Sequence, residues 1–343
     1  MFLDFNMRVG YNPYKDQKND ESKYIHQVII PVYIPNHEAY FKDSFTILKL
    51  CLESLFATIH KKTFITIANN GSDKIVSDYL DALLIQNKIQ ELIHTENIGK
   101  LNAILKGLVG NDIELVTIAD SDVMFLPNWQ VETVKVFTHV PNAGVVGIVP
   151  QFKMYESYCG NLLLHNFFNK NMKFIPVKNK DALVRFYDSI GWDRNYNEDY
   201  LEFNLGIKIN DNMNVLVGSG HFVATYKKNM FEQIPSYFCY KMGGSSEDYL
   251  DDLPLKKDYW RLTTEDNYAY HMGNVLEDWM FEKSNQITSE NVVYRQNFTN
   301  KTKSNKILYF IKNRLFIKFI SINWTKKMFL RWKKLPSNMA DKY

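Results

Sequence analysis

Short apolar runs alternate with amphipathic stretches along the first third of the chain. Residues 24–35 are apolar and β-branched and contain Pro31 and Pro35, which predicts a buried strand that stops there. Residues 45–60 carry Leu or Ile every three or four positions, the pattern of an amphipathic helix. The alternation continues with strands expected within 63–73, at 88–95 and up to residue 120, and with helices near 74–86 and 101–109. Strands that alternate with helices predict a parallel sheet with right-handed crossovers.

Polar signatures follow each of these strands. They are Tyr33, the Asn69-Asn70-Gly71 turn, the segment from Asn97 to Lys100, and Asp120-Ser121-Asp122. Ligands of such sheets bind at the carboxyl ends of the strands, so these side chains are expected to meet at one edge.

Composition places the chain among ordinary globular proteins. Its 343 residues are 45% hydrophobic and 23% charged, enough for one large α/β domain with appendages or for two domains. The three cysteines are far apart, which argues against a disulfide framework or zinc knuckle and fits a reducing compartment. No leader pattern and no apolar run of spanning length is seen, so a cytoplasmic protein is expected.

The chain has a net charge of +3, but its charged residues are distributed unevenly along the sequence. Residues 291–340 contain twelve Lys or Arg and no acid, whereas the body before them is acidic. The segment 301–334 is expected to contact the anionic inner face of a membrane, or to dock as a C-terminal helix on the domain's own apolar surface. No nucleic-acid partner is expected, because no recognisable binding module accompanies the charge. The expected divisions are an arm at 1–22, a domain at 23–290 whose halves meet at 125/126, and a basic extension at 291–343.

Six short segments follow one another along the chain, and their order and spacing are more specific than any one of them: VIIPVY, ANNGSD, ENIGKLNA, ADSDV, EDYLDD and YHMGN. Together, over about residues 24–275, the chain resembles the family 2 glycosyltransferases. The resemblance implies the GT-A fold, a Rossmann-like mixed and mainly parallel sheet flanked by helices. It also implies transfer of a sugar from a nucleotide-diphosphate-sugar, with a UDP-sugar favoured, to a glycan or lipid-linked saccharide in surface polysaccharide assembly. Inversion at the anomeric carbon is the usual outcome.

Asp120 and Asp122 end an apolar strand at the expected binding edge. Oxygen ligands of this kind suit Mn²⁺ or Mg²⁺. The expected metal residues are therefore Asp120, Asp122 and His271. The resemblance implies that Asp122 contacts the metal, that Asp120 lies toward the ribose, and that His271 is a third ligand. A solvated pair of turn carboxylates is the alternative reading.

Asp248 is the candidate general base, with Glu247 as the second choice, since an inverting transfer needs a carboxylate to take the acceptor's proton. An acidic helix start is the plainer reading of the same residues. Asn69 stands where the family has an aspartate that reads the base, and an amide could still bind a pyrimidine edge. The donor-binding residues expected by resemblance are Pro31, Tyr33, Asn69, Asn70, Lys100, Asn102, Asp120, Ser121, Asp122 and Gly220.

Two rival functions can be weighed on the same residues. A sugar-phosphate nucleotidyltransferase needs a Gly-rich, basic loop after the first strand, and PVYIPNHE provides neither feature. A non-catalytic carbohydrate- or nucleotide-binding protein on a degenerate GT-A fold stays open, and turnover of a nucleotide-sugar would distinguish it.

Overall fold

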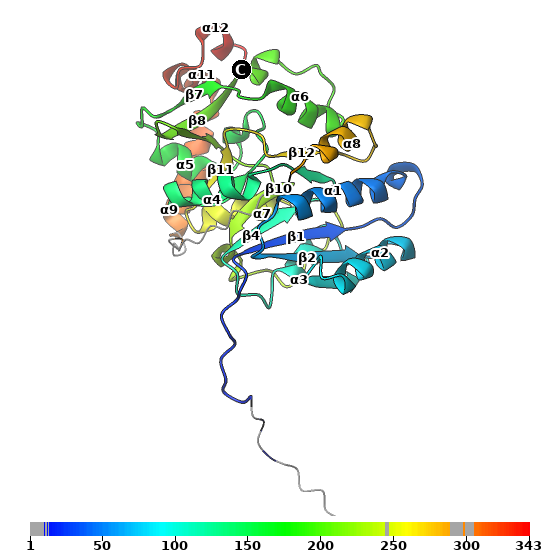
Figure 1. Ribbon diagram of the computed structural model, residues 1–343. Helices are drawn as coiled ribbons and strands as arrows, with labels where there is room; N and C mark the ends of the chain where they lie inside the picture. The colour runs from blue at the N-terminus through cyan, green and yellow to red at the C-terminus, as the bar shows by residue number, and fades with distance from the viewer. Residues whose placement is uncertain (1–9, 11, 13, 244–246, 289–297, 299–304) are drawn as a thin grey trace, which may run out of the picture.

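A ten-stranded mixed sheet forms the centre of the molecule (Figure 1). The computed structural model describes residues 10, 12, 14–243, 247–288, 298 and 305–343. In spatial order the strands are β3 (Glu91–Thr95), β2 (Thr63–Asn70), β1 (His26–Val32), β4 (Leu115–Ala119), β10 (Val223–Lys227), β6 (Ala143–Gly147), β11 (Trp260–Thr264), β9 (Met213–Val217), β8 (Phe203–Asn210) and β7 (Met172–Pro176).

Helices cover this sheet on both faces. They are α1 (Ser44–Thr58), α2 (Lys74–Ile85), α3 (Lys100–Gly107), α4 (Trp129–His139), α5 (Gly160–His165), α6 (Lys180–Ser189), α7 (Asp248–Lys256) and α8 (Asp278–Asn285), with short 3₁₀ turns at Ala39–Phe41, Met154–Glu156, Glu198–Leu201 and Lys228–Phe231.

The parallel part of the sheet, β3-β2-β1-β4, confirms the alternation predicted for the first third of the chain. All seven residues of β1 are buried. Val28 and Ile30 pack in the core with α1 and α2, whereas Ile29 packs with α3 on the other face. A strand buried on both faces reads as a continuous apolar run, as β1 does in the sequence.

Antiparallel pairs dominate the rest of the sheet. β10 inserts between β4 and β6 and runs antiparallel to both. The apolar stretch 214–227 forms two strands rather than one, because β9 and β10 lie in different places in the sheet and the chain turns at Gly218. Gly218 has φ +98°, and a Cβ there would lie 2.5 Å from the Met154 carbonyl oxygen, so the turn requires glycine.

A separate two-stranded sheet joins β5 (Val123–Phe125) to β12 (Ala269–His271). The strands are antiparallel, and His271 lies opposite Val123. This ladder brings the segment after Asp122 next to a histidine that is far away in the sequence.

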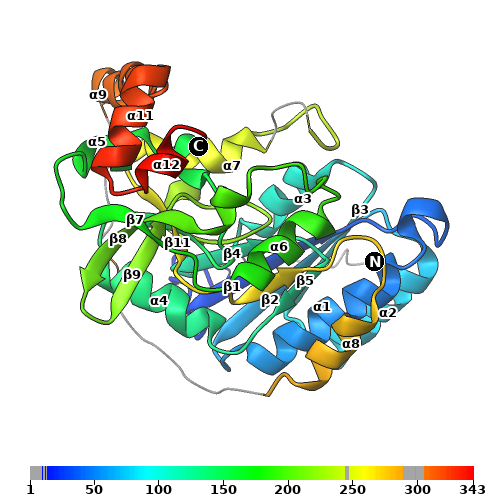
Figure 2. The ribbon, with the colours of Figure 1, turned by 90° about the horizontal axis from the view of Figure 1, so that it is seen from above.

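The C-terminal segment folds onto the second half of the sheet as α9 (Lys306–Phe310), a π-helical turn (Ile311–Leu315), α10 (Phe316–Ile320), α11 (Asn323–Trp332) and α12 (Ser337–Ala340). These helices lie along one side of the molecule: α9 is at the level of α5, and α11 and α12 are near β7 (Figure 1 and Figure 2). Ile320, Phe329 and Leu330 are buried in the core that also contains β7 to β9.

Lys333 anchors this segment. Its ammonium donates to the carbonyl oxygens of Asn166, Phe167 and Asn169 at 2.8–3.3 Å, and burial lowers its pKa to about 8. The segment therefore docks on the protein's own apolar surface, one of the two roles expected for it.

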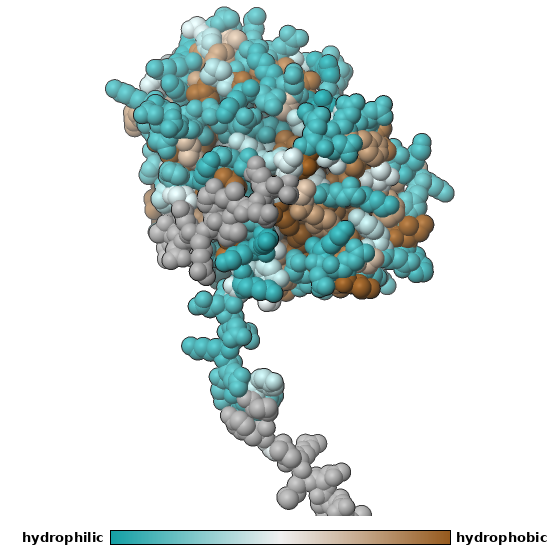
Figure 3. Space-filling view, in the orientation of Figure 1, coloured by the Kyte–Doolittle hydropathy of each residue, from teal (hydrophilic) through white to brown (hydrophobic). Residues whose placement is uncertain are grey.

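The surface view of Figure 3 shows the face drawn in Figure 1, where hydrophilic side chains predominate and apolar groups are interspersed. Within the described residues, none of the helices has the length and apolarity needed to span a bilayer.

Candidate active site

Lys100 joins two candidate segments at the carboxyl end of β4. It is the first residue of α3, and its ammonium nitrogen lies 2.8 Å from Asp120 Oδ1 and 3.2 Å from Glu247 Oε1. Burial alone would lower the pKa of the ammonium, but the attraction of the two carboxylates outweighs it and raises the pKa. The predicted donor-side residues Lys100 and Asp120 are thus in direct contact with the acidic segment that begins α7.

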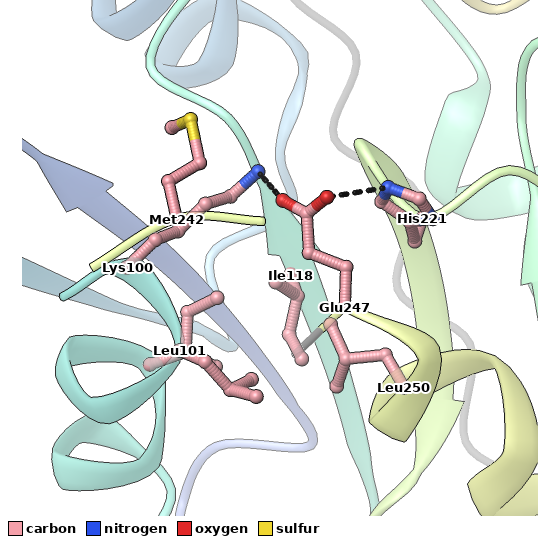
Figure 4. A pocket seen from close by; sticks show the side chains of 8 residues that line it. Lys100, Leu101, Ile118, His221, Met242, Glu247 and Leu250 are labelled. Atoms are coloured by element: carbon pink, nitrogen blue, oxygen red, sulfur yellow. Dashed lines mark hydrogen bonds and ion pairs between the residues drawn. The ribbon is translucent and has the colours of Figure 1, made fainter. Parts of the chain in front are cut away.

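Glu247 lies between two cations (Figure 4). Beyond Lys100, its Oε2 is 3.6 Å from Nε2 of His221, whose Nδ1 is 3.3 Å from Asp251 Oδ2. Contacts with Asp251 and Glu247 raise the pKa of His221 to about 9, and His221, then Lys100, lower the pKa of Glu247 to about 2. Arg261, 1% exposed, pairs with Asp251 behind them. The result is a fixed chain of alternating charges.

This network borders a pocket between α3, β4 and α7. It is lined by Lys100, Leu101, Ile104, Ile118, His221, Met242, Glu247 and Leu250. The pocket therefore combines an apolar floor with a charged rim, which is a common arrangement in ligand sites.

Asp122 and His271 face each other across the small sheet. His271 Nε2 is 3.4 Å from Asp122 Oδ2, and its Nδ1 is 2.9 Å from the hydroxyl of Ser189 at the end of α6. Asp122 Oδ1 is buried and has no hydrogen-bond partner among the described residues. Burial, against the attraction of His271, raises the pKa of Asp122. A buried carboxylate oxygen without a partner is costly, so this oxygen is suited to a ligand.

Asp248 has a different environment from its neighbour Glu247. It is exposed at the start of α7, where its carboxylate contacts the Tyr158 hydroxyl. Burial, and then the charge of Asp248, raise the pKa of Tyr158. Glu247 is held by two cations and Asp248 by none among the described residues, so Asp248 is the carboxylate that remains open to an incoming group.

Three predicted donor-binding amides make internal hydrogen bonds. Asn69 donates to Ser77 Oγ and His94 Nδ1 and accepts from the Ser72 N–H, at 2.9–3.0 Å. The side chain of Asn70 accepts from the Ile98 N–H at 2.9 Å. Asn102 bonds the carbonyl of Ile98 and both backbone groups of Phe238. These amides shape the loops around the pocket, and their contact with a donor stays a prediction.

The remaining predicted residues lie in varied settings. Pro31 is buried in β1, Tyr33 is 39% exposed after it, and Ser121 is half-buried in the turn between the two aspartates. At Gly220 a Cβ would lie 2.5 Å from the Gln151 side chain, so glycine permits a close approach there. The contacts of these residues with a donor stay predictions.

Sequence reasoning missed His221, Asp251 as its partner, and Ser189. The run Gly218-Ser219-Gly220 directly precedes His221 and is a sequence signal that points to a turn at the site. A cluster of three or more metal-ligating side chains is not found within the described residues, so the candidate protein ligands are the pair Asp122 and His271.

Comparison with solved structures finds several similar chains of low identity. Staphylococcus aureus TarS 1–349 has 14% identity and a TM-score of 0.41, covering 72% of this chain and 60% of that one. The same fragment in complex with UDP also has 14% identity and a TM-score of 0.41, covering 76% and 63%. The mannosyltransferase PcManGT from Pyrobaculum calidifontis, in complex with GDP-Man and Mn²⁺, has 14% identity and a TM-score of 0.46, covering 93% and 79%. The chain thus spans less than two thirds of the TarS chains, and no curated protein matches it.

The family match is decisive. The family described as "Glycosyl transferase family 2" matches residues 28–201, just over half of the chain. Together with the mixed sheet and its flanking helices, this match confirms the predicted GT-A fold class. The chain therefore belongs to glycosyl transferase family 2, as its resemblance to that family implied.

Proposed function

We propose that this protein transfers a sugar from a nucleotide-diphosphate-sugar to a hydroxyl group of a glycan or lipid-linked acceptor, using Mn²⁺ or Mg²⁺. The observation that carries the proposal is the Lys100 bridge between Asp120 and Glu247. It joins Asp120, after β4, to Glu247, at the start of α7, although 127 positions separate the two carboxylates in the chain (247 − 120).

Asp122 and His271 are the residues proposed to hold the metal. Oδ1 of Asp122, which has no hydrogen-bond partner in the described part of the chain, and the imidazole nitrogen facing Oδ2 form an oxygen-and-nitrogen donor set that fits Mn²⁺. When bound, the metal would offset the charge that develops on the departing diphosphate, which is worth several kcal/mol. Asp120 is paired with Lys100, so we assign it to the ribose side, where it could reach a metal only after leaving that ion pair.

Asp248 is the proposed general base. The acceptor oxygen forms a bond to the anomeric carbon while the bond from that carbon to the diphosphate oxygen breaks. The electron pair leaves with the nucleoside diphosphate, and the acceptor proton passes to Asp248. One such displacement inverts the anomeric carbon. Glu247 suits this role less well, since a carboxylate with a pKa of about 2 is a weak base.

The donor is proposed to occupy the pocket rim. Lys100 would then exchange a protein carboxylate for a phosphate oxygen, and a UDP-sugar is the favoured donor. We further propose that residues 23–125 bind the nucleotide and that residues 126–290 bind the acceptor. Residues 291–343 are proposed to be a basic C-terminal extension, whose described helices pack on the second half of the sheet. Surface polysaccharide assembly on the cytoplasmic side of a membrane is the proposed setting.

A thermal-shift panel of UDP, GDP, CDP and dTDP, each with and without Mn²⁺, tests the proposal on wild type and Asp122→Ala. A ligand that binds the native state raises the melting temperature. We expect a Mn²⁺-dependent rise with one nucleotide and its loss in the variant. No rise with any nucleotide would overturn the proposal, and a rise without release of nucleotide from its sugar conjugate would favour a binding protein.

A further inference from the structure

The outward side of the C-terminal helices carries apolar side chains that the protein does not cover. Along the continuous helical segment 306–320, Ile307, Ile311, Leu315 and Phe319 recur at every fourth position, and each is exposed by 41–68%. Residues four apart lie on one side of a helix, so these four form a stripe. We call it the first stripe.

A second stripe follows on α11. Trp324, Met328 and Trp332 again recur at every fourth position and are exposed by 46–69%. The opposite side of the same helix carries Phe329 and Leu330, which are buried in the core. The segment therefore has one apolar side for docking and another that faces solvent, which explains why its sequence shows no single apolar face.

The cations of this segment also fall into two groups, those paired with the body of the protein and those exposed beside the stripes. Lys312 pairs with Asp258, and Lys326 pairs with Glu156, so these two fasten the helices to the body. Exposed cations without an acidic partner among the described residues flank the stripes: Lys306, Arg314, Lys318 and Lys334. Exposed apolar groups interleaved with unpaired cations need an occupant that is both apolar and anionic.

We propose that the two stripes seat the protein on an anionic phospholipid surface, with Trp324 and Phe319 entering the interface and the cations contacting headgroups. Amphipathic surface helices bind leaflets through such a combination of apolar area and charge. A second copy of this chain fits less well, because two faces rich in unpaired Lys and Arg would repel each other.

The lipid-facing helices lie directly beside the proposed base. The Tyr309 hydroxyl of α9 donates to Asp252 of α7, one turn of helix after Asp248, and Lys312 pairs with Asp258 just beyond α7. This adjacency points to an acceptor that is itself anchored in the membrane, an inference that rests on the proposed function.

Co-sedimentation with lipid vesicles tests the inference on the full chain. One set of vesicles contains phosphatidylcholine alone, and the other also contains phosphatidylglycerol. We expect the wild type to sediment with the anionic vesicles and at least about tenfold less with the neutral ones. Removing two cations in Arg314→Gln/Lys318→Gln should weaken binding about 25-fold, since each cation near the surface contributes about fivefold.

Matched controls remove similar groups elsewhere. Phe319→Ala/Trp324→Ala should lose most vesicle binding, whereas Ile75→Ala/Ile85→Ala, which removes two exposed apolar side chains of α2, should keep it. Lys61→Gln/Lys106→Gln is the control for charge, as both lysines are exposed. Equal binding by the stripe variants and their controls would overturn the inference. A dimer in solution that dissociates in the Phe319→Ala/Trp324→Ala variant would also overturn the inference.

The nucleotide thermal shift, measured on the same variants, separates this inference from the proposed function. A retained shift with lost sedimentation supports the lipid surface and shows a folded donor site. If nucleotide raises the melting temperature of the wild type but the protein does not sediment with anionic vesicles, only the lipid-surface inference is overturned. A wild type that binds vesicles but shows no nucleotide shift overturns the proposed function alone.

Discussion

Replacing Lys100 by methionine keeps most of the length of the side chain and removes its charge from between Asp120 and Glu247. At an effective dielectric constant of about 20, contacts of 2.8 and 3.2 Å correspond to attractions of about 6 and about 5 kcal/mol. Much of this attraction is offset by the desolvation of an ammonium whose side chain is 19% exposed. Breaking such a buried group of charges costs about 3–5 kcal/mol, because the carboxylates remain without their partner.

The assay is thermal unfolding of the metal-free protein at neutral pH. An unfolding entropy of about 2.1 cal/mol/K per residue converts 3–5 kcal/mol into a fall in Tm of about 4–7 °C for a chain of this length. The pKa of Glu247 is lowered to about 2, so the difference from wild type should shrink as the pH falls toward 2 and this carboxylate takes up a proton. Lys106→Met, an exposed lysine on the same helix, is the control and should change Tm little.

The double variant Lys100→Met/Glu247→Gln sharpens the test. It should lose less stability than the sum of the single variants, because removing one of the two facing carboxylates relieves the repulsion that Lys100→Met exposes. Additive losses, or a fall in Tm no larger than that of Lys106→Met, would refute the reasoning.

Further predictions concern three other side chains. The raised pKa of His221 stabilises the fold fully below about pH 6.5 and less as the pH rises through 9, so His221→Gln should flatten that part of the stability profile in thermal unfolding. The full pKa shift of His221 would correspond to about 3 kcal/mol of folding stability, which solvent screening of a ring that is 35% exposed reduces to about 1 kcal/mol. An unchanged slope of stability against pH in the variant would contradict this. Asp122→Asn should keep or raise the ligand-free Tm, since Oδ1 of Asp122 has no hydrogen-bond partner among the described residues, yet lose the Mn²⁺-dependent nucleotide shift. A clear loss of ligand-free stability would reveal a structural role. Asp248→Asn should lower the rate of sugar transfer by about 10²–10⁴-fold in a turnover assay with the nucleotide shift intact, and near-normal turnover would place the base elsewhere.

The parallel half of the sheet could be predicted because its signals are local. β1 is buried on both faces and therefore apolar throughout, and α1 shows its helical period without help from distant residues. The region 155–212 has no such period. β7 there is defined by antiparallel pairing with β8, and α6 carries Phe186 and Tyr187 into a core assembled from distant segments. Contacts of that range leave no repeating pattern in the sequence.

The candidate site also has a part that could be predicted from the sequence and a part that could not. Asp120, Asp122, Asp248 and His271 could be named because strand ends and ordered motifs point to them. The salt bridge between Lys100 and Glu247, and the position of His221 between Glu247 and Asp251, depend on how α7 packs against α3 and β10. No spacing in the sequence encodes that packing, so the sequence indicates which groups are present but not how their charges are paired.

The burial of Phe329, Leu330 and Lys333 against β7 and α5 also has a consequence for how the chain is made. The strands of the parallel half, β1 to β4, all lie within the first 119 residues and therefore leave the ribosome early. The second half lacks part of its core until the segment around residue 335 has left the ribosome. During that interval the apolar surface that the C-terminal helices cover stays open, which makes the late stage of synthesis the point at which a chaperone would be needed most.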